Sequence, residues 1–227
     1  SGEALEGSGG KSIEPQKLDK IATQICAATS AGIEVAIVIG GGNLFRGLTG
    51  AAEGMDRTAA DTMGMLATIM NCVAMQDALV RAGQRTSIMS AIPVMQVCDP
   101  FTQREAVARL EAGHVVMMAG GTGNPYFTTD TAAALRALEI HADVLLKATK
   151  VDGIFSADPR TDKDAVKYDK ITYLEILEKR LQVMDSTAVT LCRDNRLPMV
   201  VFNMTVGNNI EKILRSEKLG TLVVEQV

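Results

Sequence analysis

Three segments of this 227-residue chain combine residue types that bind phosphate groups. The first, residues 40–47, reads Gly-Gly-Gly-Asn-Leu-Phe-Arg-Gly and follows an apolar run that ends at Ile39. Consecutive glycines let backbone N–H groups converge on an anion, and the guanidinium of Arg46 adds a charged planar fork. The segment is neither a Walker A motif nor a dinucleotide fingerprint, since Phe45 stands where the third glycine would be. A tight turn without a ligand is the plainer alternative.

The second segment, residues 120–130, follows the apolar run Val115–Ala119 and leads into a helical pattern. Thr128, Thr129 and Asp130 are each suited to cap that helix, where free N–H groups and the helix dipole favour an anion. Capping alone is the other interpretation. It does not account for glycines, hydroxyl groups, an amide and a carboxylate gathered in eleven positions, so we expect a second anion site.

The third segment, residues 147–159, starts at a strand end and holds Lys147, Lys150, an Asp152-Gly153 turn and an Asp158-Pro159 break. Lysines at a strand end are suited to the phosphates of ATP. Solvated lysines beside a hairpin turn are an equally simple interpretation, so this segment alone decides nothing.

Other chemistries find little support. Neither His114 nor His141 accompanies a serine or cysteine in a nucleophile elbow, and Asp, Glu and His do not cluster at metal-ligand spacing. We therefore predict no metal held by the protein itself, and any metal would arrive on the phosphates of a nucleotide. Two anion cradles at neighbouring strand ends are what phosphoryl transfer between two phosphates requires, because that chemistry needs positioning and charge neutralisation without a covalent nucleophile.

Short apolar runs alternate with helical patterns along the chain. This alternation predicts an α/β fold, a three-layer α/β/α sandwich with a mostly parallel central sheet and ligands at the carboxyl ends of its strands. One long helix is expected over Asp61–Arg81, with a broad apolar surface that favours a subunit contact. That surface comprises Met63, Met65, Leu66, Ile69, Met70, Cys72, Val73, Ala74 and Met75.

Composition narrows the classes further. The hydrophobic content of 47% supports one domain over residues 1–227, and the net charge of −4 argues against nucleic acid as a partner. Four scattered cysteines fit a reducing cytoplasm. We find no signal peptide and no uninterrupted apolar run of about 18 residues, so no membrane is expected.

At the three segments the sequence resembles the bacterial uridylate kinases, a branch of the amino acid kinase family. The motifs GGGNLFRG, GTGNPYFTTD and KATKVDGIFSADP together are specific for this branch, and the likeness spans essentially the whole chain. The resemblance implies an amino acid kinase domain that transfers the γ-phosphate of ATP, with Mg²⁺ on its phosphates, to UMP in pyrimidine nucleotide biosynthesis. The products would be UDP and ADP.

The resemblance also implies roles for individual residues. Arg46 would brace the charge in transfer, Asp130 would organise catalytic lysines and phosphates, and Asp61 would hold the UMP ribose. The remaining UMP contacts would come from Gly41, Thr122, Gly123, Asn124, Pro125, Tyr126, Phe127, Thr128 and Thr129. The ATP contacts would come from Ser1, Gly2, Gly42, Arg46, Thr149, Phe155 and Asp158. From the residues alone, Asp61 is an exposed first-turn residue and Phe155 is ordinary packing.

Two features depart from the family. Its members open with a strand that ends in Lys-Leu-Ser-Gly-Glu-Ala-Leu, whereas this sequence starts at Ser1-Gly2-Glu3-Ala4-Leu5, so we expect the first strand and its lysine to precede residue 1. The family resemblance also implies a homohexamer, GTP as activator and UTP as inhibitor, with residues 7–12 involved in activation. Gln76 and Ser87 replace effector contacts of relatives, which argues against GTP control.

Two alternatives stay open at this point. One is a carboxylate or carbamate kinase of the same fold, against which the asparagine and paired threonines of residues 122–129 argue. The other is a non-catalytic storage protein that binds nucleotide or oxyanion on this scaffold, an alternative that the absent lysine supports.

Overall fold

The computed structural model describes residues 2–7, 12–52, 54–159, 161–215 and 217–226. Contacts group the chain into two compact units, Ser1–Ala132 and Ala133–Val227. Each unit is treated by itself, and the single domain expected over residues 1–227 stays a prediction. The predicted ATP contact Ser1 lies outside the described residues, as do residues 8–11 of the segment linked to activation.

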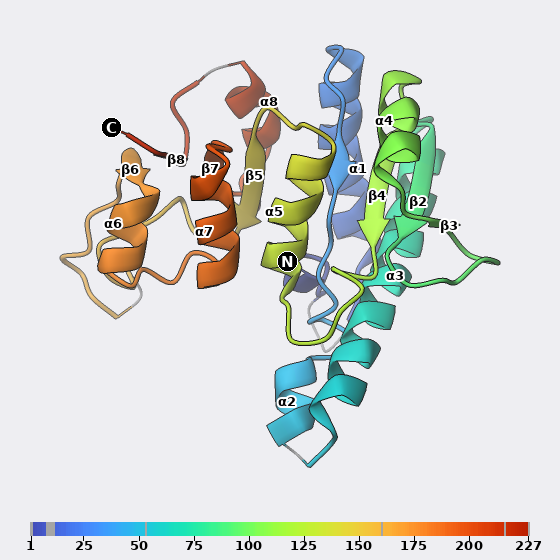
Figure 1. Cartoon of the computed structure of the whole chain (residues 1–227). Helices are drawn as coiled ribbons and strands as arrows, with labels where there is room; N and C mark the ends of the chain where they lie inside the picture. The colour runs from blue at the N-terminus through green and yellow to red at the C-terminus, as the bar shows by residue number, and fades with distance from the viewer. Residues whose placement is uncertain (1, 8–11, 53, 160, 216, 227) are drawn as a thin grey trace. The chain divides into compact units, whose positions relative to one another are not determined.

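The first unit is built on a parallel sheet with strand order β1-β4-β2-β3. Its strands are β1 (Ala36–Ile37), β2 (Thr86–Ser90), β3 (Asp99–Pro100) and β4 (Val115–Ala119). Strands β2 and β4 pair over their whole length, from Thr86 opposite Val115 to Ser90 opposite Ala119. Their carboxyl ends therefore lie side by side, and the segment after β4 is the second glycine segment (Figure 1).

Both faces of this sheet are buried at its two long strands β2 and β4, as their continuous apolar runs predict. Val115, Met117 and Ala119 alternate into a core shared with α1 (Pro15–Ser30) and α3 (Arg57–Arg81). Val116 and Met118 point the other way and are also buried. Helix α4 (Gln103–Glu111) packs on β4. A short 3₁₀ helix (Gly2–Ala4) and α2 (Gly47–Ala52) complete the unit.

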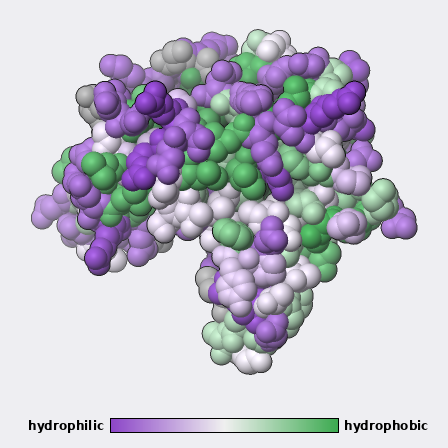
Figure 2. Space-filling view, in the orientation of Figure 1, coloured by the Kyte–Doolittle hydropathy of each residue, from purple (hydrophilic) through white to green (hydrophobic). Residues whose placement is uncertain are grey.

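Helix α3 starts four residues earlier than the sequence predicted, because Asp56 caps it through a hydrogen bond from Ala59 N at 3.0 Å. Its broad apolar surface divides in two. Met65, Ile69, Cys72 and Met75 are buried in the core, whereas a stripe at helical spacing is exposed: Met63, Leu66, Met70 and Val73. The end formed by α2 and the first turns of α3 stands away from the sheet of this unit (Figure 1), and its surface is mainly of intermediate hydropathy (Figure 2).

By length and composition alone, α3 is the one helix of the described chain that could cross a membrane. Within its most apolar window, 44% of the residues are buried inside the protein. Core helices of soluble proteins meet the same criterion, so this is weak evidence for a membrane span.

The second unit has a mixed sheet with order β5-β7-β8-β6, in which only β7 and β8 run antiparallel. The strands are β5 (Leu145–Thr149), β6 (Lys170–Thr172), β7 (Met199–Asn203) and β8 (Thr221–Val224). The helices are α6 (Tyr173–Glu178), α7 (Ser186–Asp194) and α8 (Asn209–Leu214), while α5 (Thr129–Glu139) continues across the boundary of the units. The α/β class with a mostly parallel sheet is confirmed.

Candidate functional site

The first glycine segment is held by a buried amide on α3. Asn71 is fully buried, and its Nδ2 donates to the carbonyl of Gly40 at 2.7 Å. The same side chain exchanges hydrogen bonds with the amide of Asn43 at 2.7 and 3.0 Å, and Asn43 also donates to Ser12 O at 2.8 Å. Backbone at the start and middle of the segment is thereby fixed to one helix.

The glycines of this segment are required by close packing as well as by any ligand. A Cβ on Gly41 would lie 2.6 Å from Gly64 O and 2.8 Å from the Cβ of Ala67, both on α3. A Cβ on Gly2 would lie closer still to Gly40 O. Gly42 differs, because its nearest neighbour is Arg46 at 3.5 Å, so the fold tolerates a substitution there better than at Gly41 or Gly2.

The second glycine segment is fixed to the same helix, one turn away. Thr68 Oγ1 accepts the N–H of Gly120 at 2.8 Å and donates to Met65 O at 2.6 Å, and Thr68 is buried. Gly120 has φ 76° and would place a Cβ 2.8 Å from Ser90 Oγ, so no other residue fits there without strain. Both glycine segments therefore depend on neighbouring polar residues of α3.

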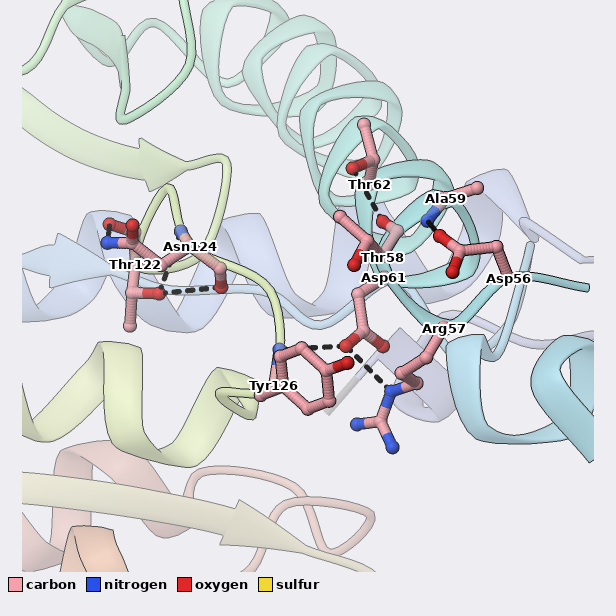
Figure 3. A network of polar contacts seen from close by, with 9 residues as sticks. All are labelled: Asp56, Arg57, Thr58, Ala59, Asp61, Thr62, Thr122, Asn124 and Tyr126. Carbon is pink, nitrogen blue, oxygen red and sulfur yellow. Dashed lines mark hydrogen bonds and ion pairs between the residues drawn. The ribbon is translucent and has the colours of Figure 1, made fainter.

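The two segments meet at Asp61. A Cβ on Gly47, the residue after Arg46, would lie 2.5 Å from Asp61 Oδ1, and Asp61 Oδ2 accepts the N–H of Tyr126 at 2.8 Å (Figure 3). The residues predicted to hold the acceptor are thus brought to one place within the first unit. Asp61 was the predicted first residue of this helix, and it lies in the second turn of α3, one turn beyond the observed start at Arg57.

Arg46 is an exposed side chain held by two acceptors. Its Nε donates to Gly42 O at 3.4 Å, and a terminal nitrogen forms an ion pair with Glu3. More than half of the side chain remains accessible, so the guanidinium retains donors for an anion. Glu3 follows Gly2, which places the start of the described chain against the first glycine segment.

The predicted helix capping is realised by Thr128. Its Oγ1 accepts the N–H groups of Asp130 at 3.1 Å and Thr131 at 3.2 Å at the start of α5. Upstream, the Thr122 hydroxyl accepts from Asn124 N at 3.1 Å, which closes a local turn. Phe127 and Tyr126 are more than half exposed, so packing does not account for two aromatic side chains there.

In the second unit, Thr149 ends β5 opposite Asn203 at the end of β7. The Thr149 hydroxyl donates to Phe202 O and Val151 O, and Asn203 Nδ2 donates to Asp152 at 2.8 Å. Phe155 is half-buried and bridges antiparallel to Lys167, whereas Asp158 is exposed. The antiparallel pairing lies beyond Asp152-Gly153, with Ser156 N bonded to Val166 O.

A pocket of about 280 Å³ opens at this strand edge. It is lined by Asp152, Lys167, Asn203, Val206, Asn209, Lys212, Lys218, Leu219 and Gly220. The three lysines give it a positive balance, as a site for a polyphosphate requires. Of the predicted ATP contacts, Thr149 lies in the strand next to the pocket, while Phe155 and Asp158 are not among its lining residues.

Gln76 and Ser87, the two departures from the effector pattern, line a separate pocket of about 250 Å³ in the first unit. The cation in that pocket is Arg109, which is bonded to Glu105 at 2.8 Å, Ser87 at 3.0 Å and Asp99 at 3.2 Å. The hydrogen bond to Glu105 is the chief reason that the pKa of Arg109 is raised. Its charge is therefore already balanced by carboxylates.

Nucleophilic side chains are poorly placed for covalent chemistry. Burial raises the pKa of the Cys72 thiol to about 12 and that of Cys192 to about 11, so the reactive thiolate is scarce. All four cysteines are free. In the part of the chain that the structure describes, no three His, Cys, Asp or Glu side chains form a group that could hold a metal.

Sequence reasoning missed Thr68 and Asn71, the residues that position the predicted loops. The available signal was their polarity: both lie within the most apolar stretch of α3, between methionines, where an unpaired polar group would be costly. Such residues must bond to something, and here they bond to backbone of the two glycine segments.

The fold and the loops define a class. The family model described as "Amino acid kinase family" matches residues 4–203, and the chain belongs to that family. Among solved structures, a UMP kinase from Bacillus anthracis is 38% identical, with a TM-score of 0.96 over 100% of this chain and 93% of that one. A UMP kinase from Ureaplasma parvum is 35% identical, with a TM-score of 0.93 over 99% and 95% of the two chains.

An archaeal relative matches less well. The uridylate kinase from Archaeoglobus fulgidus is 31% identical, with a TM-score of 0.73 over 93% of this chain and 94% of that one. The resemblance read from the three motifs is thus confirmed for family and fold.

Proposed function

We propose that this protein is a UMP kinase that transfers the γ-phosphate of ATP to UMP, giving UDP and ADP. The single observation that carries the proposal is the meeting of both glycine segments at Asp61, through Gly47, the residue after Arg46, and through Tyr126. Full-length similarity to two UMP kinases supports the same reaction. An acceptor site with ribose, phosphate and base contacts needs the Asp61 carboxylate, the Arg46 fork and the 122–129 loop together.

The chemistry follows from these groups. An oxygen of the UMP phosphate attacks the γ-phosphorus of ATP, a new P–O bond forms, and the bond to the bridging oxygen of ADP breaks. The attacking oxygen is already ionised at neutral pH, so no general base is needed. Arg46 and the N–H groups of the glycine segments neutralise charge that spreads over the transferred group.

The remaining contacts are assigned with the same proposal. Gly41, Asp61 and residues 122–129 hold UMP, and Asp130 orders the phosphates. ATP is held by Gly2, Gly42, Arg46, Thr149, Phe155 and Asp158, with Ser1 contributing from the start of the chain. Mg²⁺ would be carried on the ATP phosphates, where it would neutralise charge.

Homohexamer assembly, a cytoplasmic location and a role in pyrimidine nucleotide biosynthesis form part of the proposal. The exposed stripe of α3 supports a contact between copies, because contiguous apolar surface on a soluble protein marks an interaction site. Light scattering coupled to gel filtration measures the assembly, and Met70→Glu should shift it towards smaller species. A mass unchanged by this substitution places the contact elsewhere.

A coupled assay of ADP formation tests the reaction. We expect ADP with UMP, and little with CMP or glutamate. Turnover of CMP or glutamate without UMP would support another kinase of the family, and nucleotide binding without any turnover would support a storage protein. These assays use the full-length natural protein. Adding GTP or UTP tests the family's regulation, and the carboxylates around Arg109 lead us to expect little activation by GTP.

A further inference from the structure

Arg57, the first residue of α3, stands where a helix disfavours it. The N-terminal end of a helix carries partial positive charge, so a cation in the first turn is destabilising. Its pairing with Asp61 at position i+4 also has the cation N-terminal to the anion, the weaker of the two orders on a helix. Capping is supplied by Asp56. The stability of α3 therefore does not account for Arg57.

The contacts of Arg57 involve instead the loop of residues 122–129, which is proposed to bind the acceptor UMP. Its Nε donates to Asp61 Oδ2 at 2.7 Å, and its guanidinium carbon lies 5.2 Å from the centre of the Tyr126 ring. Tyr126 N donates to the same Asp61 oxygen at 2.8 Å. Figure 3 shows these three residues together: Arg57 lies beside both Asp61 and Tyr126, the two residues joined by this hydrogen bond.

Because both donors bond to Oδ2 of Asp61, the other carboxylate oxygen, Oδ1, is the one left to accept a hydrogen bond. The Asp61 side chain is 14% exposed, and Oδ1 accepts no hydrogen bond from any residue that the structure describes. Because both donors fix the carboxylate by its other oxygen, Oδ1 is held in one orientation and keeps its capacity to accept from a hydroxyl. A ribose hydroxyl is such a donor.

Tyr126 also needs an outside restraint. Its φ is 72°, a left-handed conformation that is strained for a residue with a side chain. The residue is 67% exposed, so core packing does not hold it. The Asp61 bond and the stacked guanidinium are the contacts that hold it in this conformation.

We propose that Arg57 is a positioning residue of the acceptor-nucleotide site: it orients Asp61 through Oδ2 and holds the loop at Tyr126 against α3. This inference rests on the function proposed above, because the site it serves is the UMP site. Arg57 acts through Asp61 and Tyr126, so its loss should weaken UMP binding more than the transfer step.

The test combines kinetics with hydrogen exchange. For Arg57→Ala we expect the KM for UMP to rise about tenfold, with kcat and the KM for ATP changed by less than about twofold. The Tyr126 amide should exchange faster with deuterated solvent in the ligand-free variant, because its acceptor is no longer held. Arg57→Lys retains the charge but not the planar guanidinium that stacks on Tyr126. Its KM for UMP and its Tyr126 exchange rate should lie between those of wild type and Arg57→Ala.

Arg81→Ala is the matched control, since Arg81 also pairs with a carboxylate four residues away on α3, at the opposite end of the helix. It should leave the KM for UMP and the Tyr126 exchange unchanged. Equal KM and exchange in Arg57→Ala and wild type would overturn the proposal, as would equal losses in all kinetic parameters. If Arg57→Ala does not fold by circular dichroism, Arg57→Gln replaces it, with the same outcomes deciding.

The two proposals fail separately. A wild-type protein from its natural start that does not phosphorylate UMP would contradict the function. The exchange rate of the Tyr126 amide would still show whether Arg57 holds the loop.

Discussion

The predicted phosphate-binding segments of the two units are held by hydrogen bonds that differ in burial. In the first unit, buried side chains of α3 reach backbone groups of the glycine segments from about 30 to 50 positions away along the chain. In the second unit, the bonds from Thr149 to Phe202 O and from Asn203 to Asp152 span similar distances along the chain, but they are half-buried and exposed, respectively. The comparison predicts that the first unit is more sensitive to loss of one polar atom, because water cannot replace a buried partner.

The largest effect is expected for Asn71→Leu. Leucine has a similar size but leaves the carbonyl of Gly40 and the amide of Asn43 without their buried partner. We expect the free energy of unfolding to fall by about 3 kcal/mol, together with a loss of UMP kinase activity. Urea denaturation measures the first. Asn195→Ala, which removes an exposed amide bonded to Leu191 O, should change stability by less than about 0.5 kcal/mol; an equal loss in both would contradict the comparison.

Thr68→Val should have a smaller effect. Valine matches the shape of threonine, so the substitution removes the acceptor for Gly120 N–H and the hydroxyl bond to Met65 O, whose carbonyl lies within the helix. We expect a loss of about 1 to 2 kcal/mol in unfolding free energy and faster exchange of the Gly120 amide. Thr68→Ser, which keeps the hydroxyl, should retain slow exchange of that amide. If Thr68→Val leaves the exchange of Gly120 as slow as in wild type, this bond does not hold the second segment.

The smallest effect is expected in the second unit. Asn203→Ala removes hydrogen bonds to Asp152 and Thr205, all of them near solvent. Water can replace those partners, so the unfolding free energy should fall by less than about 1 kcal/mol. A loss as large as that of Asn71→Leu in the same urea titration would remove the distinction between the two units.

Much of this arrangement was available from the sequence. The apolar run Val115–Ala119 predicted β4 at its observed bounds, because buried parallel strands carry a strong local signal. Thr128 was among three predicted caps, and the structure selects it. Short strands such as β3 and β6 were missed, since two or three residues show no period.

The contacts of the site were harder to predict. The sequence around Thr68 and Asn71 does not predict Gly120 and Gly40 as their hydrogen-bond partners, because those bonds join positions 52 and 31 residues apart. The same holds for Arg57, which the sequence placed before the helix. The site residues implied by the family resemblance lie within recognisable motifs. These positioning residues could be identified only from the contacts that α3 makes with both loops.

Because Thr68 and Asn71 are three residues apart on one continuous helix, they share a single rigid rod. A twist of that rod about its axis would withdraw both side chains from both loops at once. Any event that turns this helix would therefore disorder the two loops as a pair.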